Sequence, residues 1–171
     1  TWNVPKKIAR LEIIPTIQKD ISYIAKENFK VFQSYEDGAP ELVATTIDWA
    51  KVDAKTSELK FVQQPGLGNA LGHVKFIFPN TFDVYLHDTP SKSLFQRTVR
   101  DFSHGCIRLE KPIELAEFLL HINGAWSKDK ILTTIKKGTE QFVQLPRPIP
   151  VHILYWTAWV TPRGKIQFRD D

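Results

Sequence analysis

Cysteine and methionine are scarce in this chain of 171 residues, which contains one cysteine, Cys106, and no methionine. A single thiol cannot form a disulfide within the chain, and it cannot supply a metal site made of several thiolates. Cys106 is therefore either a buried structural thiol or a reactive one. Because the chain opens at Thr1 without a methionine or a signal-peptide pattern, we expect it to be an internal piece of a longer protein.

Long apolar runs and a strong charge bias are also absent. The most hydrophobic stretch, 149–160, is interrupted by polar residues and proline and falls short of the roughly 20 apolar residues of a membrane-spanning helix. The net charge of +4 is modest and spread along the chain, and the nearest basic cluster, Lys136-Lys137, is followed at once by Gly138. The sequence thus predicts neither a membrane segment nor a nucleic-acid partner. The 42% of hydrophobic residues are typical of one folded domain.

Several short segments have the residue types of β-strands. Segments 74–78 and 82–87 are rich in β-branched and aromatic residues and flank the turn Pro79-Asn80, so they predict a hairpin. Segment 151–160 is apolar on both faces, which predicts a strand buried on both sides, and 165–169 predicts one more strand. Within the buried strand we expect two core side chains, Trp156 and Trp159.

Helices are predicted over 112–124, which begins with a proline, over 127–138, which has a serine cap, and over 17–25. A strand over 29–35 follows the first helix, so the class is mainly β with packed helices (α+β). Domain organisation is predicted from a composition shift, because the region 16–64 carries more lysine and acid than the rest. We expect a small mixed subdomain at 16–64 and a core made of 1–15 and 65–171.

The reactive side chains gather at one place in the sequence, FSHGCIRL at 102–109. A thiol needs a base or a positive neighbour to become a thiolate near neutral pH, and an imidazole is a common supplier. His104 is two residues before Cys106 and reaches it only in a tight turn. His87 ends a predicted strand and can approach independently, so we prefer His87 as the general base.

The neighbours of the cysteine suggest the rest of a catalytic site. Gly105 allows a sharp turn, so that its amide and that of Cys106 could bind a developing oxyanion. Arg108 provides a fork for a substrate carboxylate. Asp88 is adjacent to His87 in a strand and so points to the opposite face, which makes a backbone carbonyl or Ser103 the better partner for the ring.

Two other interpretations of Cys106 stay open at this point. A lone cysteine is often a small buried hydrophobe, although polar neighbours and an arginine argue against that here. Zinc bound by His87, His104 and Cys106 lacks a fourth ligand and the usual spacing. The other histidines are expected to be structural or surface residues: His73, His121 and His152.

The motif SHGCIRL at 103–109, with YLHDTPS at 85–91 before it, resembles the signature of the L,D-transpeptidase (YkuD-type) catalytic domain. PGLGNALGHVKFIFPN at 65–80 and LEKPIELAEFLL at 109–120 extend the resemblance to the large Gram-negative, YcbB-like branch. This resemblance implies a β-sandwich catalytic core with an inserted capping subdomain, which corresponds to 16–64. It also implies that opening strands of the family, which precede the segment WNVP, are missing from this chain.

The resemblance further implies cysteine acyl transfer, with Cys106 as nucleophile, His87 as base and the amides of Gly105 and Cys106 as oxyanion hole. His104 is expected to support the site, while Arg108 and Ser103 hold substrate. No nucleotide, metal or other cofactor is needed, because the reaction uses energy already in the peptide bond.

The implied partners are tetrapeptide stems of peptidoglycan, as donor and as acceptor, together with carbapenem inhibitors and other wall synthases. The implied location is the periplasm of a Gram-negative bacterium, with the longer protein exported or anchored in the inner membrane. The implied activity is 3→3 cross-linking of stem peptides through a cysteine thioester. Three alternatives remain: an L,D-carboxypeptidase, attachment of a lipoprotein to the wall by the same Cys/His site, and a wall-binding module without catalysis.

Overall fold

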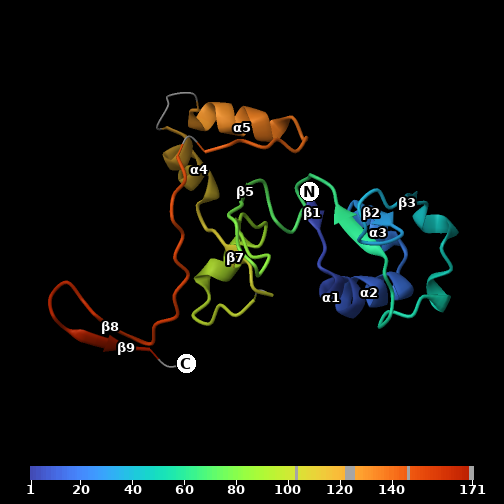
Figure 1. Ribbon diagram of the computed structural model, residues 1–171, viewed down its shortest axis with the longest axis horizontal. Coiled ribbons are helices and arrows are strands. Elements are labelled where there is room, and N and C mark those ends of the chain that lie inside the picture. The colour runs from blue at the N-terminus through green and yellow to red at the C-terminus, as the bar shows by residue number, and fades with distance from the viewer. Residues whose placement is uncertain (103, 122–125, 146, 170–171) are drawn as a thin grey trace.

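The computed structural model describes residues 1–102, 104–121, 126–145 and 147–169, and within them the chain forms small sheets and short helices (Figure 1). In chain order the elements are β1 (Trp2–Asn3), α1 (Lys6–Ile8), the π-helix η1 (Ala9–Ile13), α2 (Ile14–Lys19), α3 (Ser22–Lys26), β2 (Phe29–Phe32), β3 (Glu41–Leu42), the 3-10 helices η2 (Ala44–Thr46) and η3 (Trp49–Lys51), β4 (Lys60–Gln63), β5 (Lys75–Phe76), β6 (Leu86–His87), the 3-10 helix η4 (Lys92–Gln96), β7 (Ile107–Arg108), α4 (Pro112–Leu120), α5 (Lys128–Lys136), β8 (Ala158–Val160) and β9 (Ile166–Phe168).

The N-terminal part contains an antiparallel sheet of strand order β1-β4-β2-β3 and a hydrophobic core beside it. Phe61 of β4 is fully buried and meets the ring of Phe29 edge-on, with centroids 6.1 Å apart. Helices α1, η1 and α2 contribute isoleucines to this core, and Val4 joins them from the segment after β1. Residues 1–15 thus share one core with 16–64, and the division of the chain into catalytic core and lid stays a prediction.

The second sheet, of order β5-β6-β7, is mixed. Strands β5 and β6 pair antiparallel, which confirms the pairing expected of the predicted hairpin. Each strand is only two residues long, however, and residues 77–85 between them lie outside any strand, so the predicted strand bounds and the tight turn at Pro79-Asn80 are wrong. Strands β6 and β7 pair in parallel, and the connection between them includes the short helix η4. With these mixed sheets and a few helices, the α+β class is confirmed.

The two predicted C-terminal helices are present and are neighbours in space (Figure 1). Pro112 begins α4, and Ser127 caps α5 by accepting a hydrogen bond from the backbone N–H of Lys130. The carboxylate of Glu117 in α4 accepts a hydrogen bond from the backbone N–H of Lys128, 3.1 Å away, which joins the helices. The predicted end of the first helix at Gly124 lies outside the described residues.

The single helix predicted over 17–25 is wrong, because the structure has two short helices there. Helix α2 ends at Lys19, Asp20 is extended, and α3 begins at Ser22. The carboxylate of Asp20 accepts a hydrogen bond from the backbone N–H of Ser22 at 2.9 Å. This local bond satisfies an N–H at the start of α3 and so favours a new helix over a continuous one.

The buried strand predicted over 151–160 is also wrong. Residues 151–157 are exposed and irregular, and only Ala158–Val160 form a strand, β8, which pairs with β9 at one end of the molecule (Figure 1). Trp156 is 66% exposed and is not a core residue, while Trp159 is partly buried and stacks with Arg169. An apolar run becomes buried only when other elements cover both of its faces, and among the described residues none covers this segment. No helix in the described part of the chain has the length and apolar character to cross a bilayer.

Candidate active site

The register of strands β6 and β7 places the predicted nucleophile and base on one side of a sheet. Leu86 pairs with Ile107 and His87 pairs with Arg108. The backbone N–H of Ile107 donates to the carbonyl of Tyr85 at 3.1 Å, so the parallel alignment continues toward Cys106. Because side chains alternate along each strand, His87 and Cys106 project from the same face.

The surroundings of the strands support this arrangement. The side chains of Tyr85 and His87 are in edge contact, with ring centroids 5.9 Å apart. Burial is the main cause of the raised pKa of Tyr85. The neighbouring Cys106 raises this pKa further, both by its charge and by a hydrogen bond. The positive charge of Arg108 lies close enough to His87 to lower the pKa of its ring. The structure thus brings Tyr85, His87, Cys106 and Arg108 together.

His87 is held as a neutral ring. It is 4% exposed, and its Nδ1 is in very short contact with the backbone carbonyl of Asp88. Burial lowers the pKa of His87, and the positive charge of Arg108 lowers it too, against the opposing effect of the carbonyl. A carbonyl oxygen only accepts, so Nδ1 carries the proton and Nε2 keeps a lone pair for a thiol proton. The expected backbone carbonyl partner is confirmed, and Ser103 lies outside the described residues.

Cys106 is half-buried and lies directly before β7. Its Sγ lies 3.9 Å from the backbone carbonyl of Asp83, a residue with φ of 52° in the loop before β6. Among the described residues no group of three or more histidine, cysteine or carboxylate side chains is arranged to hold a metal ion. A half-buried position on the strand face that also carries His87 suits a thiol that must meet both a base and a substrate.

Tyr85 is a site residue that sequence reasoning missed. The alternation of side chains along 82–87 already placed Tyr85 on the face of His87, and that was the available signal. Its closeness to Cys106 depends on the parallel register between β6 and β7, which the sequence does not specify. A phenol next to the thiol can donate a hydrogen bond to a thiolate.

The other predicted site residues lie around this centre. His104 is exposed, and its Nε2 lies 2.8 Å from a carboxylate oxygen of Glu12 in η1, so it contacts the N-terminal core. Gly105 has φ of 131°, which fits the expected sharp turn. The oxyanion role of the Gly105 and Cys106 amides and the supporting role of His104 stay predictions. As expected, His121 and His152 lie on the surface.

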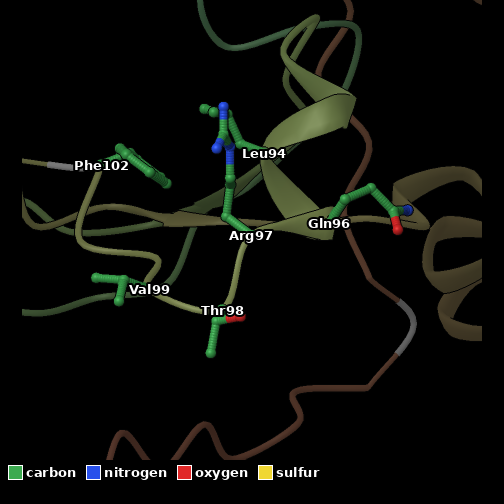
Figure 2. A pocket seen from close by; sticks show the side chains of 6 residues that line it. All are labelled: Leu94, Gln96, Arg97, Thr98, Val99 and Phe102. Carbon is green, nitrogen blue, oxygen red and sulfur yellow. The ribbon is translucent and has the colours of Figure 1, made fainter.

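The connection from β6 to Cys106 forms a cleft of about 600 Å³. Its lining consists of Leu94, Gln96, Arg97, Thr98, Val99 and Phe102. Figure 2 shows Arg97 extending beside Leu94, while Gln96 points the other way. The cleft therefore combines apolar side chains with one guanidinium in the connection that leads to Cys106, the predicted nucleophile.

Buried Asp88 organises the turn that follows His87. Its Oδ1 accepts a hydrogen bond from the backbone N–H of Thr89 at 2.7 Å and lies 2.8 Å from Nζ of Lys92. Its Oδ2 accepts from the backbone N–H of His73 at 2.9 Å and lies 3.2 Å from the His73 ring. This carboxylate thus joins three segments of the chain next to His87, the predicted general base.

Comparison with known proteins assigns a family to this arrangement. A family model described as the YkuD L,D-transpeptidase catalytic domain matches residues 1–153. A Haemophilus influenzae protein named "Putative L,D-transpeptidase" is 31% identical over 159 residues, which make up 93% of this chain. The chain spans 31% of the length of that relative.

Proposed function

The chain belongs to the family of YkuD L,D-transpeptidase catalytic domains, and from this premise we propose that it forms 3→3 cross-links between peptidoglycan stem peptides. The observation that carries the proposal is the placement of Cys106 and His87 on one face of paired strands. A half-buried thiol that shares a strand face with a neutral, buried imidazole suits nucleophilic acyl transfer.

In the first half-reaction, Nε2 of His87 takes the proton of the Cys106 thiol. The thiolate attacks the carbonyl carbon of the third residue of a tetrapeptide stem. The C–N bond to the terminal D-alanine breaks, the D-alanine amine receives the proton from His87, and a thioester remains. Amides of Gly105 and Cys106 stabilise the negative oxygen in between.

In the second half-reaction, a side-chain amine of diaminopimelate on a neighbouring stem attacks the thioester carbonyl. His87 takes a proton from this amine and returns it to the sulfur, so a new amide bond forms and the thiol is regenerated. Arg108 holds a substrate carboxylate, because it projects from the same face as His87 and Cys106.

We place this chemistry in the periplasm, with carbapenems acylating the same thiol.

The segment 16–64 is proposed to cap the site, as in the YcbB-like branch. Glu12, which contacts His104, belongs to 1–15, and 1–15 shares one hydrophobic core with 16–64. The contact therefore supports a position of 16–64 near the catalytic motif. A cap limits access of water to the thioester and favours a bulky amine as acceptor. This is the reason for preferring cross-linking to hydrolysis.

The proposal is tested by incubating the intact protein with disaccharide tetrapeptides and separating the products. We expect dimers with loss of D-alanine, and no product with Cys106→Ala. Tripeptide without dimer would instead indicate an L,D-carboxypeptidase. A protein whose wild type gives neither product, and whose Cys106 forms no adduct with a carbapenem by mass spectrometry, would refute acyl transfer at this site.

A further inference from the structure

The Asp88 carboxylate is buried next to the general base, yet the acyl-transfer steps above do not use it. Its side chain is 7% exposed. Both oxygens are engaged, Oδ1 by Thr89 and Lys92 and Oδ2 by His73. A buried carboxylate is costly unless it is paired and hydrogen-bonded, so a fully engaged one indicates a specific task.

The charge of this carboxylate is maintained by its partners. Burial by itself raises the pKa of Asp88, but hydrogen bonds from Lys92 and from the backbone N–H groups of His73 and Thr89 outweigh it and hold the pKa below its usual value. The carboxylate is therefore ionised at neutral pH and acts as a fixed acceptor for all of these donors.

Lys92 extends the network to the other catalytic strand. Its Nζ pairs with Asp88 and also donates to the carbonyls of Leu109 and Glu110, at 3.0 Å and 2.9 Å. These two residues directly follow Arg108, the last residue of β7. One ammonium group thus connects the turn after His87 to the end of the strand that begins beside Cys106.

The main chain of Asp88 is the part of this network that contacts His87. Its backbone N–H donates to the carbonyl of Val74 at 2.9 Å, and its carbonyl accepts from Nδ1 of His87. The same residue thus has its side chain held from one side and its main chain held against the ring. A shift of the carboxylate moves the carbonyl that sets the ring tautomer.

We propose that Asp88, held by Lys92 and His73, is a positioning residue that fixes its own carbonyl as the acceptor for His87 Nδ1–H. The proton of the ring stays on Nδ1, and Nε2 keeps the lone pair that receives the Cys106 proton. Asp88 acts only through His87 and does not touch the reacting atoms. This role deepens the proposed acyl transfer and rests on it.

The test measures alkylation of Cys106 by iodoacetamide as a function of pH, which reports the reactivity of the thiol without any stem peptide. Asp88→Asn is compared with Asp37→Asn, which makes the same charge change at an exposed turn between β2 and β3. We expect Asp88→Asn to slow alkylation at pH 7 by about tenfold, because a displaced His87 ring removes the thiol proton less effectively. Asp37→Asn should match the wild type.

If Asp88 acts through His87, the effect of Asp88→Asn on the alkylation rate should depend on whether His87 is present. In His87→Ala, the further change Asp88→Asn should alter the alkylation rate by less than about twofold, because the group through which Asp88 acts is gone. An equal slowing in both backgrounds would show that Asp88 only supports the fold and would overturn the proposal. A wild-type pH profile in Asp88→Asn would overturn it as well.

If Asp88→Asn does not fold, Lys92→Met provides the same comparison from a position where the side chain is 44% exposed. It should slow alkylation in the wild-type background and not in His87→Ala, and Lys92→Arg should restore part of the rate. The same slowing in both backgrounds overturns the proposal here too. Failure of the proposed function is distinct, since a wild type that yields neither dimer nor tripeptide can still show this alkylation pattern.

Discussion

Gly72 makes the packing around Asp88 directly testable, because the two residues are in close contact. Gly72 has φ of +59°, and a Cβ placed there would lie 2.4 Å from both Cγ and Oδ2 of Asp88. The carboxylate is held by donors on both oxygens and cannot move aside without losing hydrogen bonds. Gly72→Ala therefore combines backbone strain with displacement of a buried charge.

The expected cost follows from these two effects. An L-residue in the left-handed region costs about 1–2 kcal/mol. Loss of one hydrogen bond to the charged carboxylate, such as that from the His73 N–H, costs about 1.5–3 kcal/mol. We expect Gly72→Ala to lower the free energy of unfolding by roughly 3 kcal/mol or more, measured by urea denaturation, and to slow Cys106 alkylation through Asp88.

Two other glycines provide matched controls for the two effects. Gly138 follows α5 with φ of +69°, and a Cβ added there would have nothing within 4 Å, so Gly138→Ala should cost the strain alone. Gly68 has neither positive φ nor a close neighbour, so Gly68→Ala should be neutral or stabilise by up to about 1 kcal/mol. Equal losses for Gly72→Ala and Gly138→Ala would refute the claim that Asp88 is rigidly held.

Four further outcomes are expected. Tyr85→Phe should slow Cys106 alkylation roughly tenfold at pH 7, because a hydrogen bond to a charged sulfur is worth about 1.5 kcal/mol or more, and an unchanged rate would contradict a role for the phenol. Since burial lowers the pKa of His87 and a base must be neutral to accept a proton, the acid limb of kcat/KM should lie below pH 6.5, whereas a limb at or above that value would count against His87 as the base. The lowered pKa of Asp88 means that its stabilising effect is complete above pH 3.8 and is lost as the pH falls through the lower folded value. The stability difference between the wild type and Asp88→Asn should therefore shrink on going from pH 7 to pH 3, and a constant difference would be the contrary result. Phe61→Ala should cost about 3–5 kcal/mol in urea denaturation, because the ring is fully buried, and a cost below 1 kcal/mol would show that the N-terminal core is loosely packed.

Local signals predicted those elements whose ends are marked by the chain itself. A proline at the first position of α4 and a serine before α5 satisfy or remove free N–H groups, and both helices occur where expected. The break between α2 and α3 depends on one bond from Ser22 to Asp20, which a pattern of apolar spacing does not contain. Segment 151–157 shows the same limit, since its composition indicates burial but does not provide the covering elements.

By itself, the sequence predicted the candidate site of this protein: a single thiol, a histidine at the end of a strand and the motif that resembles the L,D-transpeptidases. Residue type and alternation along a strand are properties of short segments, so these predictions did not require knowledge of the tertiary structure. Only the tertiary structure decided that β6 and β7 are parallel, that Tyr85 lies beside Cys106, and that Lys92 links the Asp88 carboxylate to the residues after β7. Those facts depend on register between segments about twenty residues apart, and register is set by packing across the whole sheet.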